Sequence, residues 1–337
     1  MKRWITTVVQ PNTVNAVFKA KEDVLQIALQ NGYQPVSIFR YNSKNESNEA
    51  MDARIDGITA AVSHGDIVVF QYPTYVGNRF DLRFMSHLVS RGAKVVVFLH
   101  DAESLRGPIY FDEIGAFSQC AAIVTHNQNM SNELKKRGLK APTIENTAFD
   151  YLTTISDTPA RDTFQRAVTF AGSLDKSRFL ADWQPNTPIS VFGRHDAIKL
   201  DPKVNDMGEM FPDKLAYFLP YCFGLAWDSN IPGGGQYKNY TRYNNPHKVS
   251  MYLANGRPVI LWKEAGMAPF IESNHLGITL NSLDELDDAI AGLSDGDIDQ
   301  MLSNIQHVRR ALQEGFFTTH VLHRAEDMLL HPDIILD

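Results

Sequence analysis

The chain has 337 residues, 44% of them hydrophobic, and a formal net charge of −7. This length predicts about two globular domains. The net negative charge and the absence of a basic run exclude nucleic-acid binding through a broad positively charged surface. No stretch reaches the roughly 18 to 20 apolar residues that cross a bilayer. Because Met1–Ile5 leads directly into a strand-like run and not into a signal peptide, we expect a cytoplasmic protein.

The first half of the chain alternates strand-like and helix-like segments. Short runs rich in Val, Ile and Phe predict strands, and the segments between them carry apolar residues at helical spacing. The predicted strands are residues 4–9, 35–39, 66–71, 94–99 and 121–124, and the predicted helices are residues 14–31, 48–63, 79–91 and 128–138. Strands that alternate with helices indicate a parallel sheet covered on both faces.

A polar stretch interrupts this alternation near residues 150–166, and a second series follows it. Further strands are predicted at residues 167–170, 188–192, 222–227, 258–262 and 276–280, and a helix at residues 246–255. We therefore expect an α/β protein with a Rossmann-like domain (1–150), a linker (151–166), a second Rossmann-like domain (167–312) and a C-terminal helical segment (313–337). Two such domains define a cleft, and the last segment could pack on the second domain or cross back to the first.

A polar stretch rich in Tyr and Asn occupies residues 228–245 and contains a glycine triplet at residues 233–235. This composition predicts a loop. Such a loop could be a lid or a surface excursion, and the sequence leaves both open.

The densest chemical signal follows this loop, in residues 244–260. Pro246 at a helix start is pre-organised for the first turn, where free amides attract an anion. The positive charge of Lys248 in that turn is unfavourable, because the N-terminal end of the helix dipole is also positive. A bound diphosphate would neutralise both. The alternative is a solvated lysine on an ordinary helix.

The same segment carries a family resemblance that extends over nearly the whole chain. The matching motifs, in chain order, are residues 64–74, 97–101, 171–179, 224–228, 244–260, 263–272 and 315–318. Together they resemble the bacterial glucosyltransferase 3 family, which glycosylates serine-rich-repeat adhesins, and the related galactofuranosyltransferases. The resemblance implies the GT-B arrangement of two Rossmann-like domains, with the donor bound mainly by the second domain.

Carried over by position, the resemblance implies a donor site in the second domain. Arg178 and Lys248 would neutralise the donor diphosphate through charge-assisted contacts. Asn245 belongs to the same segment, and the turn at Gly172 and Ser173 would bring backbone close to the donor. An ordinary strand-to-helix connection is the alternative for that turn.

Glu272 is a candidate for the hydroxyl groups of the donor, since a carboxylate accepts paired hydroxyl bonds. Glu264 lies eight residues earlier, which matches the paired glutamates of many retaining GT-B enzymes. We discount that match, because the glutamate at position 264 is not a fixed feature of the family that the chain resembles.

Acceptor-binding residues are expected at the carboxyl ends of the first domain's strands, where parallel sheets place ligands. Asn12 and Thr13 follow the first strand, although they could equally cap a helix. Gln71 and Thr74 flank an aromatic and a proline, a combination suited to a sugar ring or to a simple turn.

The transfer needs a base within hydrogen-bond reach of the attacking hydroxyl. Asp101, at the tip of the most buried predicted strand, is the first candidate and His100 the second. Either could instead bind backbone amides of its loop. The resemblance implies direct attack with inversion and no covalent intermediate.

Metal and disulfide chemistry are not expected. The acidic residues 297 and 299 lie in the first turn of a helix, which the helix dipole explains. His320 and His323 share a helix face without a third ligand. Cys120 and Cys222 lie in apolar runs, which predicts buried free thiols. We therefore expect no cofactor beyond the UDP-sugar donor.

The leading hypothesis is transfer of glucose from UDP-glucose to an N-acetylglucosamine-bearing protein. A galactofuranosyl or other hexosyl transferase acting on a lipid-linked glycan is the alternative, and a non-catalytic partner protein is the third. A dinucleotide-dependent enzyme is excluded, because residues 10–15 after the first strand contain no glycine. The resemblance also suggests a homo-oligomer, with a tetramer as the candidate, but no pattern fixes the subunit number.

Overall fold

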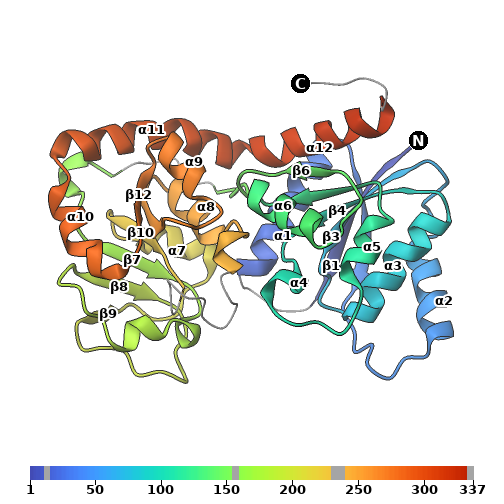
Figure 1. The fold of residues 1–337 in the computed structure, drawn as a ribbon, viewed down its shortest axis with the longest axis horizontal. Coiled ribbons are helices and arrows are strands. Elements are labelled where there is room, and N and C mark those ends of the chain that lie inside the picture. Colours follow the sequence, from blue (N-terminus) through green and yellow to red (C-terminus); the bar gives the residue numbers. More distant parts are fainter. Residues whose placement is uncertain (11–15, 154–158, 229–239, 332–337) are drawn as a thin grey trace. The chain divides into compact units, whose positions relative to one another are not determined.

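The computed structural model describes residues 1–10, 16–153, 159–228 and 240–331. The chain divides into two compact units (Figure 1). The described residues of the first unit lie within Met1–Thr13, Val17–Asn146 and Gly315–Asp337, and those of the second lie within Val14–Ala16 and Thr147–Glu314. Among the described residues, no helix combines the length and apolarity that crossing a bilayer requires.

The first unit is built on a parallel six-stranded sheet in the order β2-β1-β3-β4-β5-β6. β3 and β4 lie at its centre, and every residue of β3 is buried. The strands are β1 (Arg3–Val9), β2 (Gln34–Phe39), β3 (Ile67–Tyr72), β4 (Lys94–Leu99), β5 (Ala122–Thr125) and β6 (Thr143–Glu145). The helices are α1 (Ala16–Gln30), α2 (Asn48–Ile58), α3 (Asn78–Ser90), α4 (Glu103–Arg106), α5 (Glu113–Ser118), α6 (Gln128–Lys136) and α12 (Phe316–Leu330).

The second unit contains another parallel six-stranded sheet, in the order β12-β11-β10-β7-β8-β9. Its strands are β7 (Val168–Ala171), β8 (Ile189–Phe192), β9 (Val204–Asp206), β10 (Phe223–Ala226), β11 (Val259–Trp262) and β12 (Gly277–Leu280). Its helices are α7 (Pro212–Phe218), α8 (His247–Ala254), α9 (Ala268–Ser273), α10 (Leu286–Gly292) and α11 (Asp295–Glu314). Its described residues also form the short 3-10 segments η1 (Arg161–Thr163), η2 (Leu174–Lys176), η3 (Arg178–Ala181), η4 (Tyr240–Arg242) and η5 (Leu283–Glu285). Both sheets have the parallel strands that the alternation predicts.

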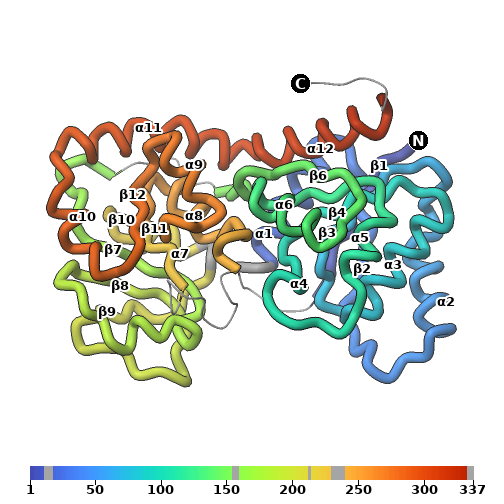
Figure 2. Tube along the Cα trace, in the orientation of Figure 1, coloured from blue at the N-terminus to red at the C-terminus, as the bar shows by residue number. Residues whose placement is uncertain are grey.

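The last helix, α12, packs on the first unit, although it follows the second unit in the chain (Figures 1 and 2). Glu326 Oε2 pairs with Arg3 at 3.0 Å, and its Oε1 accepts a hydrogen bond from Tyr33 at 2.8 Å. Lys94 donates to the Leu329 carbonyl oxygen at 2.8 Å. Arg3 and Lys94 are the first residues of β1 and β4, so α12 lies at the amino ends of the strands.

Gly315 begins this helix with a left-handed φ of 78°. A Cβ atom at this position would lie 2.6 Å from Cγ1 of Ile27 on α1, so both the backbone conformation and the close packing require glycine. Asn31, just after α1, donates a hydrogen bond to Thr319 at 3.1 Å. These contacts fix the entry of α12 against α1.

Several expectations can be compared with the fold directly. Cys120 and Cys222 are buried free thiols, as predicted. Asp297 accepts hydrogen bonds from the backbone and hydroxyl of Ser294 at the start of α11, in agreement with the helix-start interpretation. Among the described residues, no cluster of three or more metal-ligating side chains occurs. The glycine triplet at residues 233–235 lies outside the described residues.

Candidate functional site

The turn after β7 comes close to two neighbouring segments of the second unit. Gly193, which follows β8, lies so near this turn that a Cβ atom would sit 1.9 Å from the Gly172 carbonyl oxygen. A Cβ atom on Gly172 would sit 3.2 Å from the Lys248 ammonium nitrogen. Because Gly172 and Gly193 have no side chains, the turns after β7 and β8 and the Lys248 ammonium group can lie close together at one edge of the sheet.

Lys248 lies in the first turn of α8 and is half-buried. Its ammonium group lies 3.9 Å from the centre of the Phe170 ring, a cation–π geometry. Burial lowers the pKa of Lys248 to about 8, and the charge of Asp228 opposes that shift. The structure thus brings a cation, an exposed glycine backbone and a helix N-terminus together at the carboxyl end of β7.

Tyr252, one helical turn after Lys248, holds α8 against the sheet. Its hydroxyl oxygen accepts a hydrogen bond from the Ala171 backbone at 2.8 Å. Its ring lies on Gly224 of β10, where a Cβ atom would sit 2.2 Å from the ring carbon Cγ. Sequence reasoning missed this role of Tyr252, although its spacing of four residues from Lys248 places both on one helix face.

The other predicted donor residues belong to the same unit and have different partners. Asn245 is buried and donates to the Thr147 carbonyl oxygen at 2.8 Å, which anchors the segment before α8. Ser173 is exposed in the turn after β7, and Arg178 is exposed at the start of η3 (Arg178–Ala181). Glu272 is exposed on α9 and accepts a hydrogen bond from the Thr279 hydroxyl at 2.6 Å. Their donor-binding roles stay predictions.

Glu264, the other glutamate of the discounted pair, forms an ion pair with Arg242. The Arg242 guanidinium lies 4.8 Å from the centre of the Trp262 ring. This contact holds η4 (Tyr240–Arg242) against the end of β11. Glu264 therefore has an ion-pair partner within its own unit.

In the first unit, the described candidates lie at the carboxyl ends of β3 and β4 or directly after them. Gln71 is buried, and its side-chain amide donates to the Thr6 carbonyl oxygen at 2.8 Å. His100 is also buried, and its Nε2 donates to the Gln71 side-chain oxygen at 2.8 Å. Thr74 donates from its backbone to Asp81 at 3.1 Å and also from its hydroxyl. The structure therefore brings Gln71 and His100 together, and turns Thr74 inward.

Asp101 is half-buried, unlike these neighbours. Its Oδ2 accepts a hydrogen bond from the Tyr75 hydroxyl at 3.1 Å and lies 3.4 Å from an Arg106 guanidinium nitrogen. Burial and the Asp101 charge raise the pKa of Tyr75, so the phenol stays protonated and remains a donor. Of the two candidate bases, Asp101 is the more accessible to an acceptor. Asn12 and Thr13 lie outside the described residues.

A buried carboxylate holds the loop that carries Asp101. Glu113 accepts hydrogen bonds from the backbone of Glu103 at 3.0 Å and of Ser104 at 2.9 Å, at the start of α4. Its Oε1 also accepts from the Tyr72 hydroxyl at 2.7 Å. The sequence contains no local signal for this contact, because Glu113 lies on a different helix.

Two further buried charges lie at this edge, and sequence reasoning missed both. Lys21 on α1 donates to the Gln71 carbonyl oxygen at 3.3 Å. Burial lowers the pKa of Lys21 to about 7 and raises the pKa of Asp81 on α3 to about 7, while their mutual attraction opposes both shifts. The apolar spacing of α1 does not reveal a lysine that is only 6% exposed.

His126, directly after β5, is a third buried ionisable group. Its Nε2 donates to the Leu99 carbonyl oxygen at 3.1 Å. Burial lowers the pKa of His126 to about 4, although the Asp101 charge acts in the other direction. Between about pH 4 and pH 6.5, the imidazole is therefore neutral in the folded protein and charged in the unfolded chain.

We expect this histidine to make the protein less stable in mild acid. Between its unfolded and folded pKa values the unfolded chain binds the extra proton, so the free energy of unfolding falls as pH falls. The loss from pH 7 to pH 5 is about 2 kcal/mol. Urea unfolding at both pH values should show a smaller loss in His126→Gln, which keeps an N–H donor. An identical loss in that variant would contradict the assignment.

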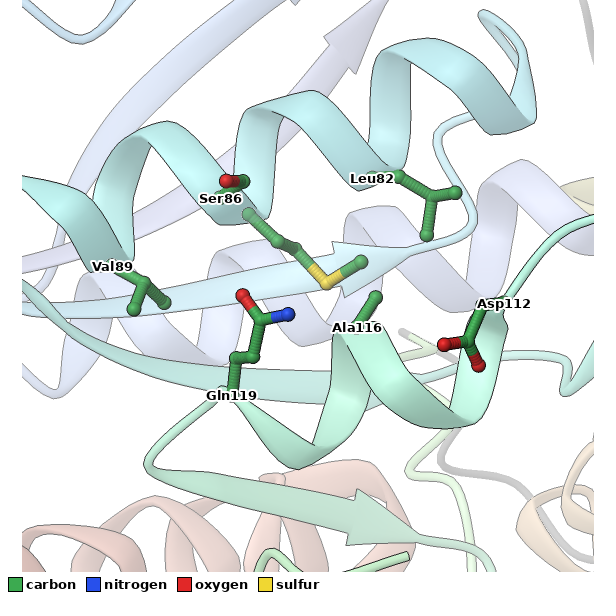
Figure 3. A pocket seen from close by; sticks show the side chains of 7 residues that line it. Leu82, Ser86, Val89, Asp112, Ala116 and Gln119 are labelled. Atoms are coloured by element: carbon green, nitrogen blue, oxygen red, sulfur yellow. The ribbon is translucent and has the colours of Figure 1, made fainter.

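A cavity of about 210 Å³ lies between α3 and α5, on the helical layer of the first unit (Figure 3). Its walls are Leu82, Met85, Ser86, Val89, Asp112, Ala116 and Gln119. None of the predicted site residues lines it. The loops at the carboxyl ends of the strands therefore remain the candidate site.

Comparisons with known proteins find relatives that match nearly the whole chain. Glucosyltransferase 3 of Streptococcus gordonii is 27% identical over 96% of this chain and 97% of its own length. The β-1,6-galactofuranosyltransferase WbbI of Escherichia coli strain K12 is 26% identical over 94% of this chain and 96% of its own length. A solved α-glucosyltransferase in complex with UDP superimposes with a TM-score of 0.59 at 12% identity, over 98% of this chain and all of that one.

The fold and the sequence identify the same group of proteins. The two parallel six-stranded sheets, each covered by helices, and the structural neighbours show an α/β GT-B fold. Residues 2–147 match the family described as glucosyltransferase 3-like, N-terminal domain, and residues 168–325 match its C-terminal domain. The resemblance predicted from the motifs is thus confirmed, and the chain belongs to the glucosyltransferase 3-like family of glycosyltransferases.

Proposed function

We propose that the protein transfers a hexose, with glucose as the first candidate, from a UDP-sugar to a glycan-bearing acceptor. The observation that carries the proposal is the Lys248 ammonium group beside the Gly172 backbone at the carboxyl end of β7. A cation beside a helix N-terminus favours a diphosphate, and Lys248 in the first turn of α8 supplies that combination. Relatives named glucosyltransferase 3 and a neighbour in complex with UDP support the choice of donor.

The acceptor that we propose is an N-acetylglucosamine-modified serine-rich-repeat protein in the cytoplasm. Asp101 would take the proton of the attacking hydroxyl while the sugar carbon leaves the UDP β-phosphate oxygen, with inversion and without a metal ion. Arg178, Ser173, Asn245 and Glu272 would complete the donor site. A homo-oligomer is part of the same proposal.

A galactofuranosyltransferase is the second candidate, because WbbI covers nearly the whole chain at an identity close to that of glucosyltransferase 3. The acceptor would then be a glycan intermediate of polysaccharide synthesis. UDP-galactofuranose as the donor distinguishes the two functions.

Calorimetric titration with UDP, UDP-glucose, UDP-N-acetylglucosamine, UDP-galactose and UDP-galactofuranose, each with a chelator present, tests the proposal. We expect UDP to bind with micromolar affinity and one sugar nucleotide to support transfer to an acceptor. Absence of binding to every one of these compounds would favour a non-catalytic partner protein or a donor with another nucleotide.

A further inference from the structure

The pairing between β7 and β10 is short and lies where the strand order of the second sheet reverses. From β7 the sheet continues through β8 and β9 on one side, and through β10, β11 and β12 on the other. In parallel α/β sheets, ligands bind outside the carboxyl ends of the strands at such a point. Among the described residues, β7 and β10 are paired at two positions, Val168 with Phe223 and Thr169 with Gly224, whereas β7 and β8 are paired at four. The pairing with β10 therefore ends before the carboxyl end of β7.

The Tyr252 hydroxyl group takes the next position along this pairing. The backbone amide of Ala171, two residues after Thr169, donates to the Tyr252 oxygen at 2.8 Å. The same hydroxyl donates to the Leu225 carbonyl oxygen of β10 at 3.5 Å. In an uninterrupted parallel ladder, this amide and this carbonyl would be bonded to each other. The tyrosine therefore continues the hydrogen bonding between two strands that have already separated.

A glycine on β10 leaves room for the tyrosine ring. Tyr252 is fully buried, and its ring lies against Gly224. A Cβ atom at position 224 would lie 2.2 Å from Cγ and 2.3 Å from Cδ2 of the ring. A larger residue would displace the ring and, with it, the hydroxyl group. The place of the hydroxyl between β7 and β10 therefore depends on both residues.

The carboxyl end of β7 contacts α8 through three successive residues. The Phe170 ring centre lies 3.9 Å from the Lys248 ammonium nitrogen. Ala171 donates to the Tyr252 hydroxyl oxygen. At Gly172, a Cβ atom would lie 3.2 Å from the same ammonium nitrogen. Because Lys248 and Tyr252 are four residues apart, they contact the end of β7 from one face of α8.

We propose that Tyr252 is a positioning residue for the donor, whose hydroxyl group holds the turn after β7 beside Lys248. The inference rests on the proposed function, in which the donor diphosphate binds at Lys248 and the Gly172 backbone. The tyrosine touches no substrate, because its side chain is fully buried. Without the hydroxyl group, the Ala171 amide loses its partner and the turn can move away from the lysine.

The test compares UDP affinity in Tyr252→Phe and in a matched control on the same strand. Tyr252→Phe keeps the ring against Gly224 and removes the hydroxyl group alone. We expect UDP binding to weaken about fivefold, the effect of one lost hydrogen bond between neutral groups. In the control, Thr169→Val, a buried hydroxyl that donates to the Ser190 carbonyl oxygen at 3.2 Å is lost on the β8 side. The control should bind UDP like the wild type, even if its thermal midpoint falls equally.

A double-mutant cycle with Lys248→Ala separates positioning from a loss of stability. If Tyr252 acts by holding the turn beside the lysine, the two substitutions affect the same contacts and their effects are not independent. Tyr252→Phe should then weaken UDP binding less than about twofold in the Lys248→Ala background. A loss of stability alone leaves the affinity of the folded protein unchanged in both backgrounds. An equal fivefold loss in both backgrounds would overturn the inference.

Gly224→Ala is a second variant that reaches the same hydroxyl group by another route. Its Cβ atom should displace the ring, so UDP binding should weaken at least as much as in Tyr252→Phe. Gly224→Ala decides the question if Tyr252→Phe does not fold. Wild-type affinity for UDP in folded Tyr252→Phe, or in folded Gly224→Ala where that variant has to replace it, contradicts the positioning role.

Titration with inorganic pyrophosphate separates this inference from the proposed function. If the wild type binds UDP and Tyr252→Phe binds it equally well, the role of Tyr252 fails and the proposed function stands. If the wild type binds no uridine nucleotide, the proposed function fails, and pyrophosphate affinity then decides the role of Tyr252. Weaker pyrophosphate binding in Tyr252→Phe than in the wild type would support that role, and equal or absent binding would refute it.

Discussion

Replacing Asp101 with asparagine is expected to lower the turnover number at least about 100-fold, the smaller end of the range for a general base. The asparagine oxygen can still accept the hydrogen bond from Tyr75, but an amide cannot take the proton of the acceptor hydroxyl. Donor binding should not change, because the proposed donor residues belong to the second unit. Initial rates and UDP titration of the same preparation measure both quantities.

Glu103→Gln is the matched control for this variant. Glu103 shares Arg106 with Asp101, so its loss also frees the arginine from one carboxylate. We expect less than about a tenfold change in turnover, because no general base is removed. Comparable losses in both variants would mean that the arginine contacts, and not a base, limit the reaction. Turnover close to the wild-type value in Asp101→Asn would move the role of base to His100.

Replacing Lys248 with alanine is expected to weaken UDP binding at least about tenfold, the effect of one charge-assisted contact of 1.5 to 3 kcal/mol. The thermal midpoint should change little, since a half-buried lysine whose pKa is lowered contributes no net stabilisation through its charge. Calorimetry gives the affinity, and thermal unfolding without ligand gives the stability.

The pH dependence of UDP affinity provides a second readout for Lys248. Because the pKa of Lys248 is about 8 in the free protein, the ammonium group is present below that pH and is lost above it. Wild-type affinity should therefore fall above pH 8, and the affinity of Lys248→Ala should not. Lys263→Ala, at an exposed lysine that follows β11, is the control and should bind UDP like the wild type. A fall above pH 8 that persists in Lys248→Ala would contradict the placement of the diphosphate.

The main strands could be predicted because they are buried on both faces, as β3 and β4 are. Such strands appear in the sequence as continuous apolar runs. β6 and β9 could not, because each has three residues at the edge of its sheet and only one of these is buried. α2 ends at Ile58, five residues before the predicted end, and the Thr59 hydroxyl bonds back to the Ile55 carbonyl oxygen. A local hydrogen bond of this kind competes with further helix.

The sequence could identify a candidate residue where that residue and the element that carries it belong to one short motif. Lys248 and the helix that carries it lie in one segment, so the spacing and the family resemblance were enough to single it out. Lys21 lies on α1, Asp81 lies on α3 and Tyr75 lies in the loop after β3, so they come together only when α1 and α3 pack on the sheet. A local pattern shows a charged residue on a helix, but it does not show that the residue will be buried.

The position of α12 has a consequence for synthesis on the ribosome. The first unit receives its last helix only after the entire second unit has been translated, about 180 residues after Asn146. At roughly 5 to 20 residues per second, that interval lasts about 10 to 40 seconds. During it, the surfaces of α1, β1 and β4 that later bind α12 stay uncovered. A chain that ends at Glu314 would contain every strand of the two described sheets but would lack α12. The surfaces of the first unit that bind α12 would then stay uncovered.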